Sequence, residues 1–459
     1  MVMEVETVSR EFIKPTSPTP HHLRTHSLSF LDQYAPSIYV PMVFFYMNQE
    51  TSIPLTDIIA SNHKRSQRLK QSLSETLTLF YPFAGRIKDS LSIDCNDKGA
   101  YYVEARVNRP LNDLLNLPDP SFIPELLPAE AGWTETGGGC VAMIQVTTFA
   151  CGSIVIGTFL SHMIVDGPAA STFLRSWAAV TSKSGEEAVC PKFDASLVYP
   201  KSETYPKEAT NLALFSPFFK KGICSSRRII FDASAIASLK TKTASASVPD
   251  PTRVETVSAL LSKCIMATFK AKSDVQKPTL INHAVNLRQR AVPPVPKHTM
   301  GNFLCMAAAL LTGKETELGD LVCHLRKAIR KADGDFVKSL QGEGGLLKYC
   351  KYIEEMGKAS SGAAGQVDFI GFSSWCNFGL YEIDFGWGKP TWVTSSASNK
   401  SETMFPNMII LMDTKMGDGV EAWVFLDEHD MIMLEQNEEL LAFVFLEQSP
   451  VKSGLCCLK

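Results

Sequence analysis

The chain has 459 residues, of which 45% are hydrophobic and 20% charged, and its formal net charge is −3 at pH 7. This length exceeds what a single hydrophobic core usually holds, so the sequence predicts two domains. The charge is nearly balanced and no long basic run is present, which excludes an electrostatic case for nucleic-acid binding. The twelve cysteines include no CxxC pair, which favours free thiols in a reducing, cytoplasmic protein without a metal.

No membrane-spanning segment is expected from the distribution of apolar residues along the sequence. The most apolar region, residues 141–160, is interrupted by polar residues such as Gln145 and Ser153, so buried strands fit it better than a membrane span. The N-terminus, Met1–Thr7, is acidic where a signal peptide would be basic.

The first half alternates strand and helix patterns. A helix is predicted from Ser61–Asn62 to Tyr81–Pro82, because Leu69, Leu73 and Leu77 recur every four residues and give it one apolar face. Strands are predicted at Glu6–Ile13, Tyr39–Tyr46, Leu91–Cys95, Tyr101–Arg106, Val141–Phe149 and Gly152–Leu160.

Periodicity fades between Cys190 and Cys224, and we interpret this part as the connection between two domains. The expected division is residues 1–195, a crossover at 196–226, and residues 227–459. In the last part, helices are predicted at Ala233–Lys242, from Thr252 onward, at Thr316–Lys331 and at His429–Phe445, and strands at Arg227–Phe231, Thr279–Val285, Phe303–Leu311, Phe369–Asn377, Met408–Asp413 and Val420–Leu426. Both halves therefore mix strands and helices, which indicates an α/β protein.

One stretch, Ser161–Gly167, carries the first chemical hypothesis. It follows an apolar strand and precedes a helical run, so it can present His162 in a cleft. An imidazole can accept a proton at neutral pH, and Asp166 could orient the ring or lock the local turn. On spacing alone we prefer the structural interpretation, in which both residues are satisfied within a core loop. No GxSxG elbow offers a rival nucleophile.

A second unusual stretch is Asp384–Pro390, in which two glycines surround a tryptophan. Gly386 and Gly388 permit tight backbone geometry, so the stretch could line a cleft or form a turn held by Asp384. On pattern alone we prefer the turn. Arg288 follows a predicted strand, and it could either pair with a buried aspartate or face solvent.

The two stretches together resemble the plant BAHD acyltransferases, which transfer acyl groups from coenzyme A thioesters. That family pairs an HxxxDG motif with a DFGWG motif, and here they stand complete as His162–Gly167 and Asp384–Gly388. The chain is most similar to the vinorine synthase-like group, which acetylates alkaloids and terpenoids. The stretches similar to that group include Leu31–Gln33, Tyr81–Arg86, Ala284–Arg288, Ser374–Cys376 and Met412–Thr414.

The resemblance implies two chloramphenicol acetyltransferase-like domains with a channel between them, in which donor and acceptor meet at His162. His162 would be the general base. Asp166 would turn away from the channel and pair with an arginine, for which Arg288 is the candidate. Gly167, Asp384, Gly386 and Trp387 would support the structure rather than react.

The function implied is acyl-CoA-dependent O-acylation of a plant specialised metabolite, an alkaloid or a terpenoid, by direct transfer without an acyl-enzyme. Acetyl-CoA is the expected co-substrate, no cofactor is implied, and a cytoplasmic monomer is expected. The alternatives are a larger acyl donor, an amine acceptor, or a non-catalytic binding protein on the same scaffold. A dihydrolipoyl acyltransferase domain shares HxxxDG, but it has no DFGWG.

Overall fold

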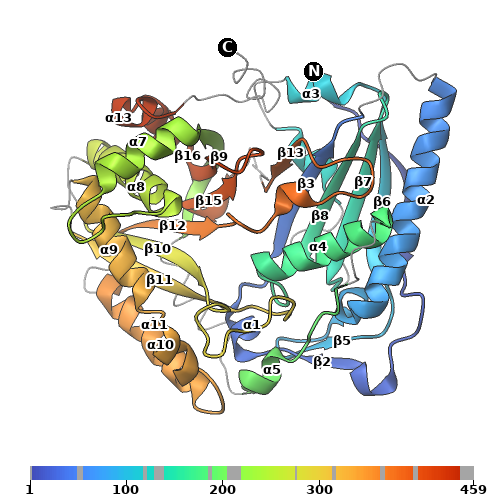
Figure 1. Ribbon diagram of the computed structural model, residues 1–459, viewed down its shortest axis with the longest axis horizontal. Coiled ribbons are helices and arrows are strands. Elements are labelled where there is room, and N and C mark those ends of the chain that lie inside the picture. The colour runs from blue at the N-terminus through green and yellow to red at the C-terminus, as the bar shows by residue number, and fades with distance from the viewer. Residues whose placement is uncertain are drawn as a thin grey trace.

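The chain forms two lobes, each built around a mixed β-sheet (Figure 1). The structure, a computed structural model, describes residues 3–48, 55–116, 121–128, 139–183, 189–203, 219–273, 277–312, 317–361, 367–395 and 402–444. Both sheets combine parallel and antiparallel pairs, so the expected α/β class is confirmed.

The first sheet has the strand order β1-β6-β7-β8-β3-β13. Strands β6 and β7 are parallel, and the other neighbours are antiparallel. Their bounds are β1 Glu6–Ile13, β3 Tyr39–Tyr46, β6 Ala100–Val107, β7 Ala142–Phe149, β8 Ile154–Ser161 and β13 Trp392–Thr394. Every residue of β8 is buried, which explains why its sequence reads as a nearly continuous apolar run.

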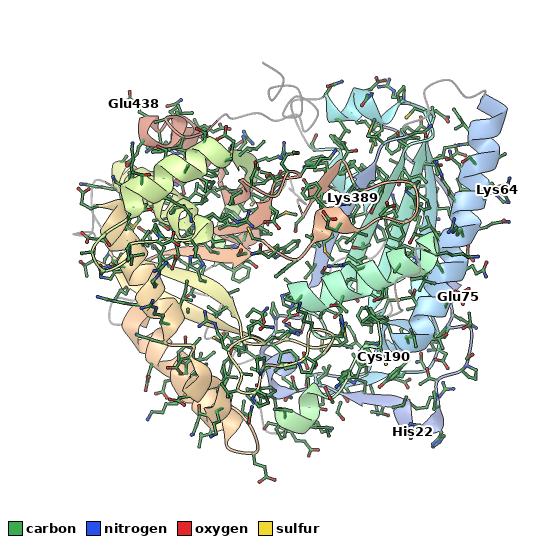
Figure 2. All side chains as sticks on the ribbon, viewed as in Figure 1. His22, Lys64, Glu75, Cys190, Lys389 and Glu438 are labelled. Carbon is green, nitrogen blue, oxygen red and sulfur yellow. The ribbon has the colours of Figure 1, made fainter. Side chains whose placement is uncertain are left out.

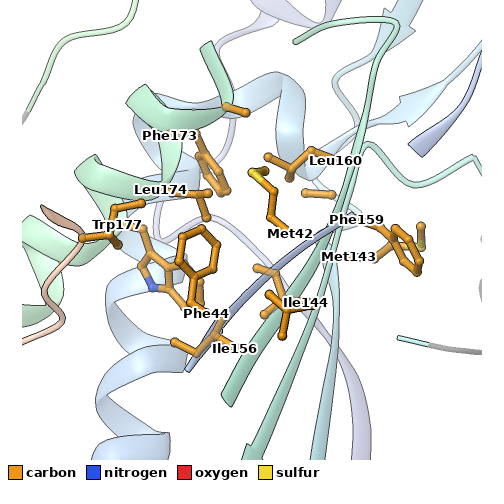
Figure 3. Close-up of a cluster of buried hydrophobic side chains, with 14 of the residues drawn as sticks. Met42, Phe44, Met143, Ile144, Ile156, Phe159, Leu160, Phe173, Leu174 and Trp177 are labelled. Atoms are coloured by element: carbon orange, nitrogen blue, oxygen red, sulfur yellow. The ribbon is translucent and has the colours of Figure 1, made fainter. Parts of the chain in front are cut away.

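Two helices, α2 (Leu55–Leu79) and α4 (Gly167–Ser182), pack beside this sheet and against each other. The indole Nε1 of Trp177 on α4 donates to the carbonyl oxygen of Leu69 on α2, at 3.2 Å. Side chains of α4, among them Phe173 and Trp177, point into the apolar cluster formed with β3 and β8 (Figure 3). The opposite face of α2 carries charges, and Figure 2 shows Lys64 and Glu75 directed outward from it. The first lobe therefore holds α4, and the turn before it, on a large packed core.

The second sheet has the order β11-β10-β12-β15-β16-β9-β14, and α7, α8 and α9 pack beside it. Strands β10, β12 and β15 are parallel to one another. The strands are β9 Phe219–Phe231, β10 Thr279–Asn286, β11 Leu304–Leu311, β12 Asp368–Ser374, β14 Glu402–Pro406, β15 Met408–Asp413 and β16 Val420–Asp427, and the three helices are α7 Ala233–Thr243, α8 Arg253–Ser273 and α9 Leu318–Arg330.

Smaller elements connect the lobes and complete them. They are β2 Thr25–Ser27, β4 Arg86–Ile87 and β5 Ser92–Asp94, which form a small sheet, and the helices α1 Phe30–Tyr34, α3 Leu111–Leu115, α5 Ala195–Val198, α10 Gly334–Ser339, α11 Gly345–Ser361, α12 Glu428–Glu435 and α13 Glu438–Leu441. No helix in the described part of the chain is both long enough and apolar enough to span a bilayer.

The two lobes exchange segments in both directions. Strand β13 lies late in the sequence, yet it pairs with β3 in the first sheet, and Trp392 stacks on Phe45 there. In return, Phe30 and Leu31 of α1 lie in the core of the second lobe. The expected domain boundaries at 1–195 and 227–459 remain a prediction. Strand β13 and helix α1 each lie in the lobe opposite to the one that this division would give them.

Several predicted element bounds were wrong. The strand expected at Phe369–Asn377 ends at Ser374, because the chain turns at residues 376–377. Strand β9 begins at Phe219 rather than Arg227, because its first residues pair with the edge strand β14, where lysines are tolerated. Helix α2 already begins at Leu55. The helix expected at His429–Phe445 is broken at Asn437, whose side chain accepts from the Leu440 N–H at 3.0 Å and starts α13. Phe445 itself lies outside the described residues.

Candidate active site

His162 lies in the turn between β8 and α4, where the first sheet meets the second lobe. Its main-chain N–H donates to Ile38 at 2.9 Å, which fixes the chain as it leaves the strand. Three residues later, Val165 forms an isolated parallel bridge with Gly301 of the second lobe. Asp166 then caps α4 by accepting from the Ala169 N–H at 3.1 Å. The turn that carries His162 is therefore anchored on both sides of the lobe interface.

The imidazole of His162 is oriented by Asn302. Nδ1 lies 3.1 Å from the side-chain oxygen of Asn302, whose amide nitrogen donates to the His162 carbonyl at 2.7 Å. The same nitrogen also donates to Asp32 at 3.0 Å. Because both amide hydrogens have acceptors, the amide oxygen faces Nδ1, so that Nδ1 carries the proton. This tautomer leaves the lone pair of Nε2 available as a base.

Asp32 forms the layer behind Asn302. Its buried carboxylate accepts from the N–H and the hydroxyl of Ser29, at 2.9 and 2.6 Å, and from the N–H of Asn302 at 2.7 Å. Burial raises the pKa of Asp32, and these hydrogen bonds act in the opposite direction. Burial also lowers the pKa of His162, while the charge of Asp166 and the Asn302 contact oppose that shift. A lowered pKa keeps the ring neutral, as a general base requires.

The carboxylate of Asp166 is directed to Arg288. The guanidinium of Arg288 binds it at 2.5 and 3.0 Å, and the Phe303 N–H also donates to it, at 3.0 Å. Arg288 in turn donates to the carbonyls of Thr299 and Gly301. The expected pairing of Asp166 with Arg288 is confirmed, and only 3–4% of either side chain is exposed. This bidentate pair joins the HxxxDG turn to the second lobe.

Gly167 provides room for an aromatic ring. A Cβ atom at this position would lie 2.2 Å from Phe378, so any side chain would displace that ring. Phe378 is held in turn by its backbone carbonyl, which accepts from the Ser171 hydroxyl at 2.5 Å. The glycine of HxxxDG thus permits a close approach between α4 and the loop after β12.

Two cavities adjoin at this turn. The first, of about 550 Å³, contains His162 and is called the apolar cavity. Most of its lining is aliphatic or aromatic: Ile38, Val40, Met42, Val165, Leu304, Met306, Phe369, Trp375, Leu380 and Met408. The second, of about 830 Å³, is called the basic cavity, and its charged side chains are Arg175, Arg288, Arg290 and Lys297. They share the lining residues Pro168, Ala284, Val285, Asn286, Ser374 and Phe378.

The DFGWG motif lies apart from both cavities. The Asp384 carboxylate accepts from the N–H groups of Gly386 and Gly388, at 2.7 and 3.0 Å, and both glycines have positive φ. Phe385 packs edge-on against Trp177 of α4, and Trp387 packs against Tyr46 and under Arg65. The motif therefore forms a turn that is stabilised by the Asp384 hydrogen bonds and packs against α4. This geometry is consistent with the structural role expected for Asp384, Gly386 and Trp387.

Several site residues were missed in the sequence. Asp32 stands out in the sequence only as part of Leu31–Gln33, a stretch similar to the vinorine synthase-like group, and no motif marks Asn302. Asp32 and Asn302 are 270 positions apart, so no local spacing predicts their contact. The one available signal was an asparagine next to a glycine between two predicted strands, and in the structure that glycine, Gly301, has a positive φ.

The comparisons with known proteins agree with this geometry. The Transferase family matches residues 3–441. A limonoid 7-O-acetyltransferase of Citrus sinensis is 50% identical over 98% of this chain and all of its own length. Stemmadenine O-acetyltransferase of Catharanthus roseus is 34% identical, covering 95% and 97%. The crystal structure of vinorine synthase superposes with a TM-score of 0.79 at 32% identity, covering 97% of this chain and 100% of that one. The chain therefore belongs to the Transferase family, the BAHD acyltransferases that its two motifs predicted.

Proposed function

We propose that this enzyme transfers an acetyl group from acetyl-CoA to a hydroxyl of a plant specialised metabolite, a terpenoid or an alkaloid. The observation that carries the proposal is the placement of His162. Its Nδ1 is bonded to Asn302, its Nε2 keeps a lone pair, and it lines the apolar cavity, which shares part of its wall with the basic cavity. A neutral imidazole in this cavity suits proton transfer during direct acyl transfer.

The basic cavity suits the donor. Arg175, Arg290 and Lys297 line it, and the phosphates of coenzyme A are anionic. The apolar cavity suits the acceptor, because 550 Å³ lies within the roughly 300–1,000 Å³ range of small-molecule sites and far exceeds what an acetyl group needs. Acyl-CoA is thus a co-substrate that enters on one side, and the acceptor enters on the other.

The reaction follows from this arrangement. Nε2 of His162 takes the proton of the acceptor hydroxyl while its oxygen forms a bond to the thioester carbonyl carbon. The tetrahedral oxyanion then collapses, the carbon–sulfur bond breaks, and the imidazolium returns its proton to the coenzyme A sulfur. Asp166 stays bonded to Arg288 throughout and holds the turn. No acyl-enzyme forms, and no cofactor takes part.

The test is release of free coenzyme A thiol from acetyl-CoA in the presence of a panel of terpenoid and alkaloid alcohols. We expect release with at least one acceptor, and loss of it in His162→Ala at unchanged thermal stability. Near-normal transfer by a folded His162→Ala variant would overturn the role of this residue. No release with any acceptor would favour a non-catalytic binding protein instead.

The same assay separates the remaining alternatives. Longer acyl-CoA donors and amine acceptors are tested in parallel, and a higher kcat/KM with either would replace the acetyl or hydroxyl assignment. We further expect a monomer in the cytoplasm, which sedimentation and a fluorescent fusion in plant cells would check.

A further inference from the structure

The apolar cavity contains one carboxylate among its described lining residues, and that carboxylate is fully occupied. It belongs to Asp166, which accepts two hydrogen bonds from Arg288 and one each from the N–H groups of Ala169 and Phe303. A carboxylate offers about four lone-pair positions, so none is left for a ligand. The charge itself is neutralised by the buried guanidinium.

The next carboxylate, Asp32, is also closed to the cavity. It lies behind Asn302, is 1% exposed, and accepts from both Ser29 and Asn302. The titratable side chains in the described cavity lining are then His162, which must be neutral to act, and the phenol of Tyr34. The described residues that line the adjoining cavity add only cationic or neutral groups, such as Arg175 and Arg290.

We infer that the acceptor is a bulky, electrically neutral polycyclic alcohol of the terpenoid or steroid type, and that the cavity discriminates against acceptors carrying a protonated amine. This inference rests on the proposed function and narrows its acceptor class. An ammonium group entering the cavity would lose its hydration shell without gaining a counter-ion from the lining residues that the structure describes. A neutral ring system buries its apolar surface against Met306, Phe369 and Leu304 without that penalty.

Aromatic faces do not reverse this preference. Phe369, Trp375 and Phe378 line the cavity and could each attract a cation. The stabilisation from one such contact is several times smaller than the cost of dehydrating an ammonium ion. The aromatic rings therefore reduce the discrimination but do not remove it.

The chemical step adds to the preference. When Nε2 of His162 takes the hydroxyl proton, the imidazole becomes cationic inside the same cavity. A bound ammonium would repel that charge in a medium of low dielectric constant and raise the barrier. We therefore expect protonated acceptors to be weaker in both binding and turnover.

The experiment uses three matched acceptors with acetyl-CoA. They are a neutral steroid-type alcohol, its aza analogue with a tertiary amine, and the N-methyl quaternary derivative of that analogue. At about pH 7 we expect the aza and quaternary compounds to have about tenfold or more lower kcat/KM than the neutral alcohol. At a pH raised above the pKa of its tertiary amine, the aza analogue recovers and the quaternary compound does not. Equal kcat/KM for all three, or a preference for the cations, would overturn the inference.

A pair of variants tests the cause. Met306 lies on β11 in the cavity wall, and Met306→Glu adds a carboxylate there, while Met306→Gln adds a neutral polar group of the same size. We expect the ratio of quaternary to neutral kcat/KM to rise about tenfold or more in the Glu variant relative to the Gln variant. An unchanged ratio in two folded variants would count against the charge argument.

Binding separates this inference from the proposed function. Calorimetric titration of His162→Ala with the same three compounds measures acceptor preference without turnover. Preference for the neutral compound there supports the inference even if no acetyl transfer is seen, whereas transfer without that preference supports only the proposed function.

Discussion

The side chain of Asn302 holds His162 at two points, by accepting from the Nδ1–H and by donating to the main-chain carbonyl. One amide thereby fixes both the tautomer and the position of the ring. Asp32 fixes the amide in its turn. Asp166, the acidic residue close to His162 in sequence, instead connects the turn to Arg288 of the other lobe.

Replacing Asn302 is expected to lower turnover more than it weakens substrate binding. Asn302→Ala removes the group that orients Nδ1, so we expect kcat to fall by about 10²-fold while KM changes little. It also removes one donor from Asp32, the side-chain N–H of Asn302, which costs about 1–3 kcal/mol of stability, while the main-chain N–H at this position still donates to Asp32. Steady-state kinetics and denaturant unfolding measure the two effects.

Asn437→Ala is the matched control for that variant. It removes an asparagine hydrogen bond at the start of α13, far from the cavities, so it should lower stability without changing kcat. A normal kcat in a folded Asn302→Ala enzyme would show that the ring needs no such partner.

The pH dependence of the reaction should reflect the lowered pKa of His162. Burial disfavours the imidazolium, so the free enzyme keeps a neutral base at pH values where an ordinary histidine, of pKa about 6.5, is already half protonated. We therefore expect kcat/KM to be constant above about pH 6.5 and to fall only at lower pH. Thiol-release rates with a neutral acceptor across that range provide the check. An acid limb centred above the ordinary histidine pKa would contradict the assignment.

The Asp166–Arg288 pair should act mainly on stability. Either single alanine variant leaves a buried charge without its partner, which typically costs about 3–5 kcal/mol. The double variant should lose less than the sum of the two, because no unpaired charge remains. Denaturant unfolding of the unchanged protein, the two single variants and the double variant gives the coupling free energy between Asp166 and Arg288.

Kinetics of the same four proteins separates structure from chemistry. The kcat of correctly folded Asp166→Ala should stay well above that of His162→Ala. Native stability combined with complete loss of turnover would instead favour direct participation of Asp166.

A substitution at Phe378 should partly offset the loss of stability caused by a substitution at Gly167. Gly167→Ala places a methyl group against the Phe378 ring, and overpacking of this kind costs about 1–3 kcal/mol. Adding Phe378→Ala removes the obstacle, so the double variant should recover part of that loss.

Because Phe378 lines both cavities, Phe378→Ala alone should also raise kcat/KM for longer acyl-CoA donors relative to acetyl-CoA. An unchanged donor preference would show that this ring does not limit the acyl group.

Much of the fold could be predicted because its signals are local. The apolar run of β8 and the four-residue spacing in α2 each depend on neighbours in sequence. The two motifs placed His162 correctly beside a cavity. The pairing of Asp166 with Arg288 was predicted from the resemblance to the BAHD acyltransferases, because spacing alone did not decide the role of either residue.

The rest depends on contacts between distant residues. Strand β13 has three residues, and its strand character comes from pairing with β3, more than three hundred positions earlier. Asn302 sits in a loop whose sequence shows no periodicity, and its role depends on Asp32 and His162 arriving from elsewhere. The break at Asn437 was missed because the polar run around it, Glu435–Glu439, consists mostly of Glu and Gln, which favour helix.

The exchange of β13 has a consequence for synthesis on the ribosome. While the first half of the chain emerges, the edge of β3 has no neighbouring strand, since residues 392–394 have not yet been made. An open edge of this kind readily pairs with other chains. The first sheet is therefore completed only when a segment near the end of the chain has been made, and its open edge is accessible to other chains until then.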